Sequence, residues 1–220
     1  MKIVSVYARK GGVGKSTFSY TLACYAAEQG MSVMLVCADP QGDAARWASG
    51  GDRALTPDDL FKSDRGFDVL YAPGDVPKEF DGNHDLVVVD LPPEGKAIRW
   101  VEPALWLSPH DGRDSLLDTL PVMPAMLEQS RAILVVFNRA EVGGKSPLKM
   151  LQDAVAGLDQ AGLRLWHQEI PNAGSVARVK DCHAPPWETP YGSSSAGTKA
   201  IREMCQGVFN LLPHLSNGRS

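Results

Sequence analysis

The sequence has few cysteines, and they follow no recognisable pattern. There are four in 220 residues, and no two are spaced as CxxC. This argues against a zinc ribbon, an iron–sulfur site or a disulfide framework. No apolar stretch approaches the roughly 18 residues of a membrane span, and the apolar run at the N-terminus is too short for a secretory signal. We therefore expect reduced cysteines and a cytoplasmic location.

An excess of basic charge is also lacking. The chain has 22 Lys and Arg against 26 Asp and Glu, a net charge of −4, which argues against a protein coated with positive charge for nucleic acid. The distribution is uneven, because residues 1–130 hold 12 basic and 19 acidic side chains whereas residues 131–220 hold 10 and 7. If a polyanion binds, the last third is the expected region. The candidates there are Arg178, Lys180, Lys199 and Arg202.

The remaining composition is that of an ordinary globular protein. Hydrophobic residues make up 44% and charged residues 22% of the chain, which argues against disordered, collagen-like and coiled-coil classes. The length favours one domain over two. We predict a single domain over 1–215, followed by a short tail at 216–220.

Short apolar runs alternate with segments of helical spacing. The runs span 3–8, 33–38, 67–71, 86–89, 104–107, 133–137 and 163–170. Most are nearly continuous and β-branched, as in strands buried on both faces of a parallel sheet. The helical segments span 15–29, 114–129, 149–161 and 198–212, and surface loops are expected at 49–65 and 184–196. This order predicts an α/β fold: a doubly wound, mostly parallel sheet flanked by helices in three layers, with ligands at the carboxyl ends of the strands.

A glycine-rich loop lies between the first strand and the first helical segment. Its residues are Arg9, Lys10, Gly11, Gly12, Val13, Gly14, Lys15, Ser16 and Thr17. Glycines let successive N–H groups point at one centre, and the helix N-terminus adds partial positive charge; both suit a di- or triphosphate. In such a P-loop, Lys15 neutralises the β and γ phosphates and Ser16 offers its hydroxyl to Mg²⁺. Because Arg9 stands where the general pattern has glycine, the loop is a deviant form, and we predict nucleotide binding by Gly11 to Thr17.

Two aspartates follow predicted strands, at the edge where the phosphates would lie. Asp39 follows 33–38, and Asp90 follows 86–89. A magnesium nucleotide needs a carboxylate within reach of the metal and a group that orients the attacking water, and two aspartates can divide these roles. Alternatively, Asp39 caps a helix or a turn, and Asp90 ends a strand in a turn.

The loop, with its additional lysine at position 10, resembles that of the ParA/MinD family of P-loop ATPases. Asp39-Pro-Gln-Gly looks like the second signature of that family, and Asp90-Leu-Pro-Pro looks like its Walker B motif. The resemblance extends from residue 2 to about residue 212. It implies ATP and Mg²⁺ as cofactors. It also implies catalytic roles for Lys10, Lys15 and Asp39, and metal roles for Ser16, Asp39 and Asp90.

The resemblance assigns further roles. Lys10 would reach the partner's nucleotide across an ATP-sandwiched homodimer. Asn138, with its paired donor and acceptor, would read the adenine edge, with Arg139 and Pro171 nearby, although an Asn at a strand end is often only a turn residue.

Cys37 departs from the commoner family form, which has an acidic residue there, so it puts the rate of hydrolysis in doubt.

Cargo varies within the family, so the function rests on what this chain has or lacks. Its first strand begins at residue 2, and it is most like the short plasmid partition proteins. We predict a slow, nucleoid-associated DNA partition ATPase whose ATP dimer binds DNA non-specifically until a ParB-like partner stimulates hydrolysis. The alternatives are a positioning or conjugation-accessory ATPase acting on a protein cargo or membrane, and a nucleotide switch with negligible turnover. The thin cationic flank of segment 198–212 argues against membrane anchoring.

Overall fold

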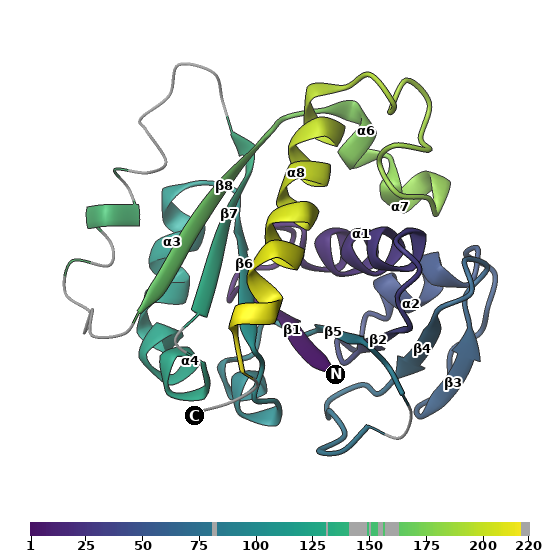
Figure 1. Cartoon of the computed structure of the whole chain (residues 1–220), viewed down its shortest axis with the longest axis horizontal. Coiled ribbons are helices and arrows are strands. Elements are labelled where there is room, and N and C mark those ends of the chain that lie inside the picture. The colour runs from purple at the N-terminus through teal and green to yellow at the C-terminus, as the bar shows by residue number, and fades with distance from the viewer. Residues whose placement is uncertain are drawn as a thin grey trace.

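A mostly parallel sheet forms the centre of the molecule (Figure 1). The computed structural model describes residues 1–80, 83–130, 132–140, 149, 151–153, 156 and 163–216. The strands are β1 Lys2–Val6, β2 Val33–Cys37, β3 Asp59–Lys62, β4 Asp68–Tyr71, β5 Leu86–Asp90, β6 Leu105–His110, β7 Ala132–Ala140 and β8 Arg164–Pro171. Their spatial order is β3-β4-β2-β5-β1-β6-β7-β8, and of these pairs β3-β4 is antiparallel. The predicted doubly wound α/β sheet is confirmed.

Helices cover both faces of the sheet, which gives the expected three layers (Figure 1). One face packs against α1 Lys15–Glu28, α2 Asp43–Ala48, α6 Gly174–Ala177, α7 Val179–Cys182 and α8 Ala196–Leu211, which η3 Leu212–His214 follows. The other face packs against η1 Gly95–Trp100, α3 Arg113–Thr119 and α4 Met123–Gln129, the last two joined by η2 Leu120–Val122. Alternate strand residues supply the two cores, as with Ile3 on one face and Val4 on the other.

Two predicted boundaries were wrong, and one prediction falls mostly outside the described residues. The expected surface connection at 49–65 contains β3, an edge strand whose half-exposed pattern, with Leu60 62% exposed, resembles a loop in sequence. The single helix expected at 114–129 is interrupted at Pro121, because proline has no N–H to continue the helical ladder. Of the helix expected at 149–161, residues 149 and 151–153 are described and helical.

Strand order decides where a site can form. β1 lies between β5 and β6, and the chain passes from β1 through α1 to β2, on the far side of β5. Parallel strands end at the same edge, so the segments that follow β1, β2, β5, β7 and β8 meet there.

Candidate functional site

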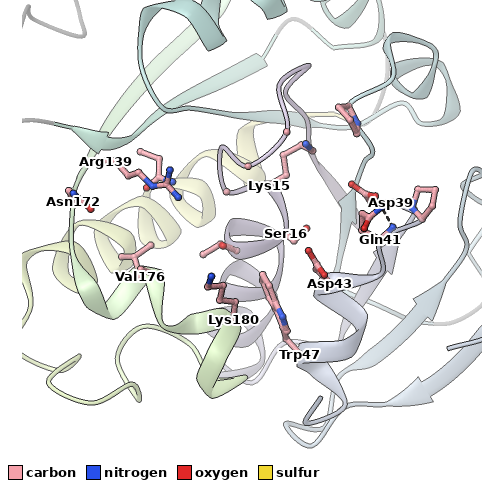
Figure 2. A pocket seen from close by; sticks show the side chains of 18 of the residues that line it. Lys15, Ser16, Asp39, Gln41, Asp43, Trp47, Arg139, Asn172, Val176 and Lys180 are labelled. Atoms are coloured by element: carbon pink, nitrogen blue, oxygen red, sulfur yellow. Dashed lines mark hydrogen bonds between the residues drawn. The ribbon is translucent and has the colours of Figure 1, made fainter. Parts of the chain in front are cut away.

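A cleft of about 650 Å³ opens at this edge (Figure 2). Its lining comes from the glycine loop and α1, from the segment after β2, from the segment after β5, and from the segments after β7 and β8. The residues are Gly11, Gly12, Gly14, Lys15, Ser16, Thr17, Asp39, Pro40, Gln41, Asp43, Trp47, Pro93, Glu94, Asn138, Arg139, Asn172, Ala173, Val176, Ala177 and Lys180. Most of the predicted site residues therefore share one cavity, while Lys10, Val13, Asp90 and Pro171 do not line it.

The glycine loop is held in a shape that only glycine fits. Gly14 has φ 105°, and a Cβ there would lie 2.9 Å from Nδ2 of Asn138 and 3.1 Å from Cε2 of Phe18. Asn138 Nδ2 donates a hydrogen bond of 3.0 Å to the carbonyl of Val13. The contact between Asn138 and Val13 therefore shapes the loop. Asn138 has this structural role in addition to its predicted role in reading the adenine edge.

Lys15 places a buried positive charge under the loop. Its side chain is 6% exposed, and Nζ donates to the carbonyl of Lys10 at 3.2 Å. Burial lowers the lysine pKa, and the nearby carboxylates of Asp90 and Asp39 oppose that shift. Within the described residues Lys15 forms no ion pair. Because the first turn of α1 also has no acidic residue, the positive end of this helix is free to hold an anion.

Asp90 is buried behind the start of α1 rather than in the cleft. Ser19 Oγ donates a hydrogen bond of 3.1 Å to Oδ1, and a hydrogen bond from the Ser16 side chain lowers the Asp90 pKa. Burial outweighs these effects and raises the pKa of Asp90 to about 7. In the described part of the chain, no Lys, Arg or His lies within ion-pair distance of it. A hydroxyl lining the cleft, backed by an unpaired buried carboxylate, fits a hard cation such as Mg²⁺.

Asp39 lines the cleft beside these groups (Figure 2). Its Oδ1 accepts a hydrogen bond of 3.0 Å from the Gln41 N–H, so it does support a turn, whereas the N-cap of α2 is Gly42. Its other carboxylate oxygen makes no hydrogen bond among the described residues and is available to a metal or water. Cys37 is buried between the two aspartates, with Sγ 4.0 Å from Oδ2 of Asp90. Burial raises the thiol pKa well above its usual range, so this position is uncharged.

The Lys10 side chain binds Asp111 and does not line the cleft. Its Nζ lies 3.2 Å from Oδ1 and 3.4 Å from Oδ2 of Asp111, and its side chain is 41% exposed. Burial of Asp111 would raise that carboxyl pKa, but hydrogen bonds from Ser115 and Lys10 hold it below its usual value. In the single chain, Lys10 is therefore bound by Asp111, the residue that directly follows β6.

The opposite end of the cleft contains Arg139 and the segment after β8. Arg139 has φ 59°, at the irregularity where β7 and β8 shift register. Pro171 ends β8 without lining the cavity, but the next residue, Asn172, does line it. Val176 and Ala177 of α6 add apolar surface. This end of the cleft therefore combines polar side chains with apolar surface.

Sequence reasoning missed several lining residues. Asp43 and Trp47 lie one turn apart on α2, which follows the Asp39 turn, so helical spacing after that motif could have indicated them. Glu94 directly follows the Asp90-Leu-Pro-Pro motif. Lys180, assigned from sequence to a possible DNA surface, also lies in the cleft wall.

The other basic candidates do not form one free surface. Arg202 pairs with Glu28 at 3.5 Å and lies 4.2 Å from the centre of the Trp187 ring. Arg178 donates to the Pro190 carbonyl at 3.0 Å. Lys199 is exposed, and among the residues that the structure describes its side chain makes no contact of this kind.

The chain is similar to known proteins in both sequence and structure. A family model described as an AAA domain matches residues 1–56. The chain is 34% identical, over 150 residues, to maintenance of carboxysome distribution protein A of Gloeobacter kilaueensis, a match covering 66% of the chain and 60% of that relative. It is 34% identical over 87 residues to nitrogenase iron protein 2 of Methanothermococcus thermolithotrophicus, covering 40% of the chain and 29% of that relative. The chain thus spans less than two thirds of either relative.

The fold matches solved structures over almost its whole length. The septum site-determining protein MinD of Pyrococcus horikoshii OT3, complexed with Mg-ADP, superposes with a TM-score of 0.72 at 20% identity, covering 96% of each chain. The predicted P-loop NTPase fold and the resemblance to the ParA/MinD family of P-loop ATPases are confirmed. In the described part of the chain, no helix has both the length and the apolarity to cross a membrane.

Proposed function

We propose that this ParA/MinD-type P-loop protein binds Mg²⁺ and ATP, dimerises around the nucleotide and hydrolyses it to position a cargo. The observation that carries the proposal is the convergence, in one cleft, of the buried Lys15, the Ser16 hydroxyl and the Asp39 carboxylate, with Asp90 behind them. The MinD structure with Mg-ADP supports the same choice of ligand. The assignment of 1–215 to one ATPase domain belongs to this proposal.

Each group has a role in hydrolysis. The loop N–H groups and Lys15 would hold the β and γ phosphates. Ser16 and Asp39 would hold Mg²⁺ from the cleft and the buried Asp90 from behind Ser16, and the bound metal would offset phosphate charge. Asp39 orients the attacking water. The water oxygen forms the new bond to the γ phosphorus as the bond to the ADP oxygen breaks, and the proton that the water loses passes to the released phosphate. Lys15 stabilises the charge that moves to ADP. Since Cys37 is neutral where a second acid would stand, slow unstimulated turnover is expected.

The position of Lys10 suits a role in a second chain. A partly exposed ion pair contributes little free energy and exchanges readily, so Lys10 can leave Asp111 when a partner's nucleotide approaches. The ATP homodimer and the contribution of Lys10 to the partner's site remain predictions. Adenine selection by Asn138, Arg139 and Pro171 also remains a prediction.

The similarity to a known protein supports a role in positioning a cargo. The relative from Gloeobacter is named for carboxysome distribution. This name supports a protein cargo, which is the alternative to the DNA partition that we predicted first. DNA binding, a ParB-like or other adaptor, and nucleoid association remain part of the proposal.

Nucleotide binding, turnover and light scattering with Mg-ATP or Mg-ADP test the proposal. We expect Lys15→Ala to lose nucleotide binding. Lys10→Ala should keep monomer binding but lose dimerisation and turnover, and Asp39→Ala should accumulate an ATP dimer. Lys199→Ala is the matched control, because this exposed lysine lies outside the cleft.

The outcomes separate the components of the proposal. Tight ATP binding by Lys15→Ala would remove the phosphate-loop assignment. A wild-type rate for Lys10→Ala would remove the role in a second chain. Titration of random-sequence DNA against the ATP, ADP and nucleotide-free states then distinguishes the cargo models, since DNA binding only with ATP, weakening steeply with salt, supports action on the nucleoid.

A further inference from the structure

We propose that Lys180 binds the phosphate chain of the nucleotide rather than DNA. This inference rests on the proposed nucleotide site. Lys180 belongs to α7, more than 160 residues after the glycine loop in the sequence, yet it lines the same cavity as Lys15, Ser16 and Thr17. Figure 2 shows its side chain on the cleft wall between Val176 and Trp47.

The acidic and basic side chains of the cleft lie on different walls. The acidic lining residues Asp39, Asp43 and Glu94 follow β2 and β5. The basic residues other than Lys15 are Arg139 and Lys180, which follow β7 and β8. Mg²⁺ and Lys15 would offset only part of the charge of a triphosphate. If the nucleoside lies at the Arg139 and Asn172 end of the cleft, the phosphates nearer to it would face the wall that follows β7 and β8. Lys180 supplies a positive charge on that side.

Lys180 is also free to bind a ligand. In the portion of the chain that the structure describes, its ammonium makes no hydrogen bond or ion pair. Two basic groups on neighbouring segments are engaged, since Arg178 donates to the Pro190 carbonyl at 3.0 Å and Arg65 pairs with Glu188 at 2.5 Å. Lys180 is thus an unpaired lysine that lines the same cavity as the N-terminus of α1, which attracts anions. A lysine in this position can bind a phosphate group.

The short helix that carries Lys180 is fixed from both ends. Val179 is fully buried in the core under α7. The carbonyl of His183 accepts a hydrogen bond of 2.8 Å from the Tyr20 hydroxyl of α1. His183 packs so closely on Gly51 that a Cβ there would lie 2.1 Å from its ring. The backbone that carries Lys180 is therefore anchored to the core and to α1.

Titration with N-methylanthraniloyl-ADP and Mg²⁺ tests this assignment. Lys180→Gln keeps most of the side-chain length and removes the charge, and we expect its ADP affinity to fall by about tenfold, the effect of one charge-assisted hydrogen bond. Lys180→Arg should retain most of the affinity. Lys199→Gln, the same change at an exposed site outside the cleft, should bind like the wild type. The difference between wild type and Lys180→Gln should shrink in high salt, which a purely structural role would not produce.

Two results would overturn the inference. If Lys180→Gln, shown to be folded by circular dichroism, binds ADP within twofold of the wild type, Lys180 is not a phosphate contact; reduced binding to random-sequence DNA at saturating ATP would then return it to a DNA surface. If the wild type itself binds neither ADP nor ATP, the proposed function fails and the inference fails with it. Wild-type binding with no effect at Lys180 refutes the inference alone.

Discussion

The buried carboxyl of Asp90 should make the stability of the nucleotide-free protein depend on pH in a defined direction. Burial raises its pKa from 3.8 to about 7. The folded protein therefore holds a proton that the unfolded chain has lost between these values. Stability from this proton is fully present below pH 3.8 and is lost as the pH rises through about 7. Three pKa units correspond to about 4 kcal/mol, and local relaxation lowers the expected value to about 2 to 4 kcal/mol.

Asp90→Asn isolates this effect, since the amide is neutral at every pH. We expect the variant to match the wild type near pH 4 and to be more stable than the wild type by about 2 to 4 kcal/mol at pH 8, measured by urea unfolding in EDTA without nucleotide. Asp118→Asn, at an exposed position of α3, is the control and should show no such divergence. A difference between Asp90→Asn and wild type that stays constant from pH 4 to pH 8 would refute the reasoning.

Three further changes test the cleft. Gly14→Ala places a methyl group 2.9 Å from the Asn138 amide at φ 105°; it should cost about 1 to 3 kcal/mol in urea unfolding and abolish ADP binding, and wild-type affinity would contradict the loop geometry. Asn138→Ala leaves the Val13 carbonyl without its 3.0 Å donor and should cost about 1 to 2 kcal/mol in unfolding free energy while weakening ADP binding. Trp47→Phe should remove most of any fluorescence change on ADP binding, because Trp47 lines the cleft; an unchanged signal would assign it to another tryptophan.

Local sequence was sufficient where the chemistry is contiguous. The strand, glycine loop and helix around Lys15 and Ser16 are adjacent in the chain, so their order alone predicted an anion site at a helix start. Short β-branched runs predicted buried parallel strands because each run contains its own pattern. The predictions were weakest where a segment has little burial, as at β3, or where Pro121 interrupts a helical periodicity.

The tertiary structure decided how distant groups meet. The sequence located Asp90 at a strand end, but only the pairing of β5 with β1 and β2 places it behind α1, next to Cys37 and Ser19. The sequence marked Lys10 as a second cation, yet its partner Asp111 lies 101 residues away.

The same holds for the far wall of the cleft. Asn138 supports the carbonyl of Val13, 125 residues earlier, and α7 brings Lys180 into the cavity of Lys15. Sequence alone determined the fold class and the position of the glycine loop between β1 and α1, because hydrophobic periodicity and glycine geometry act over a few residues. Strand order and helix packing decided the burial, charge pairing and cleft wall, because these depend on contacts between segments that no local pattern specifies.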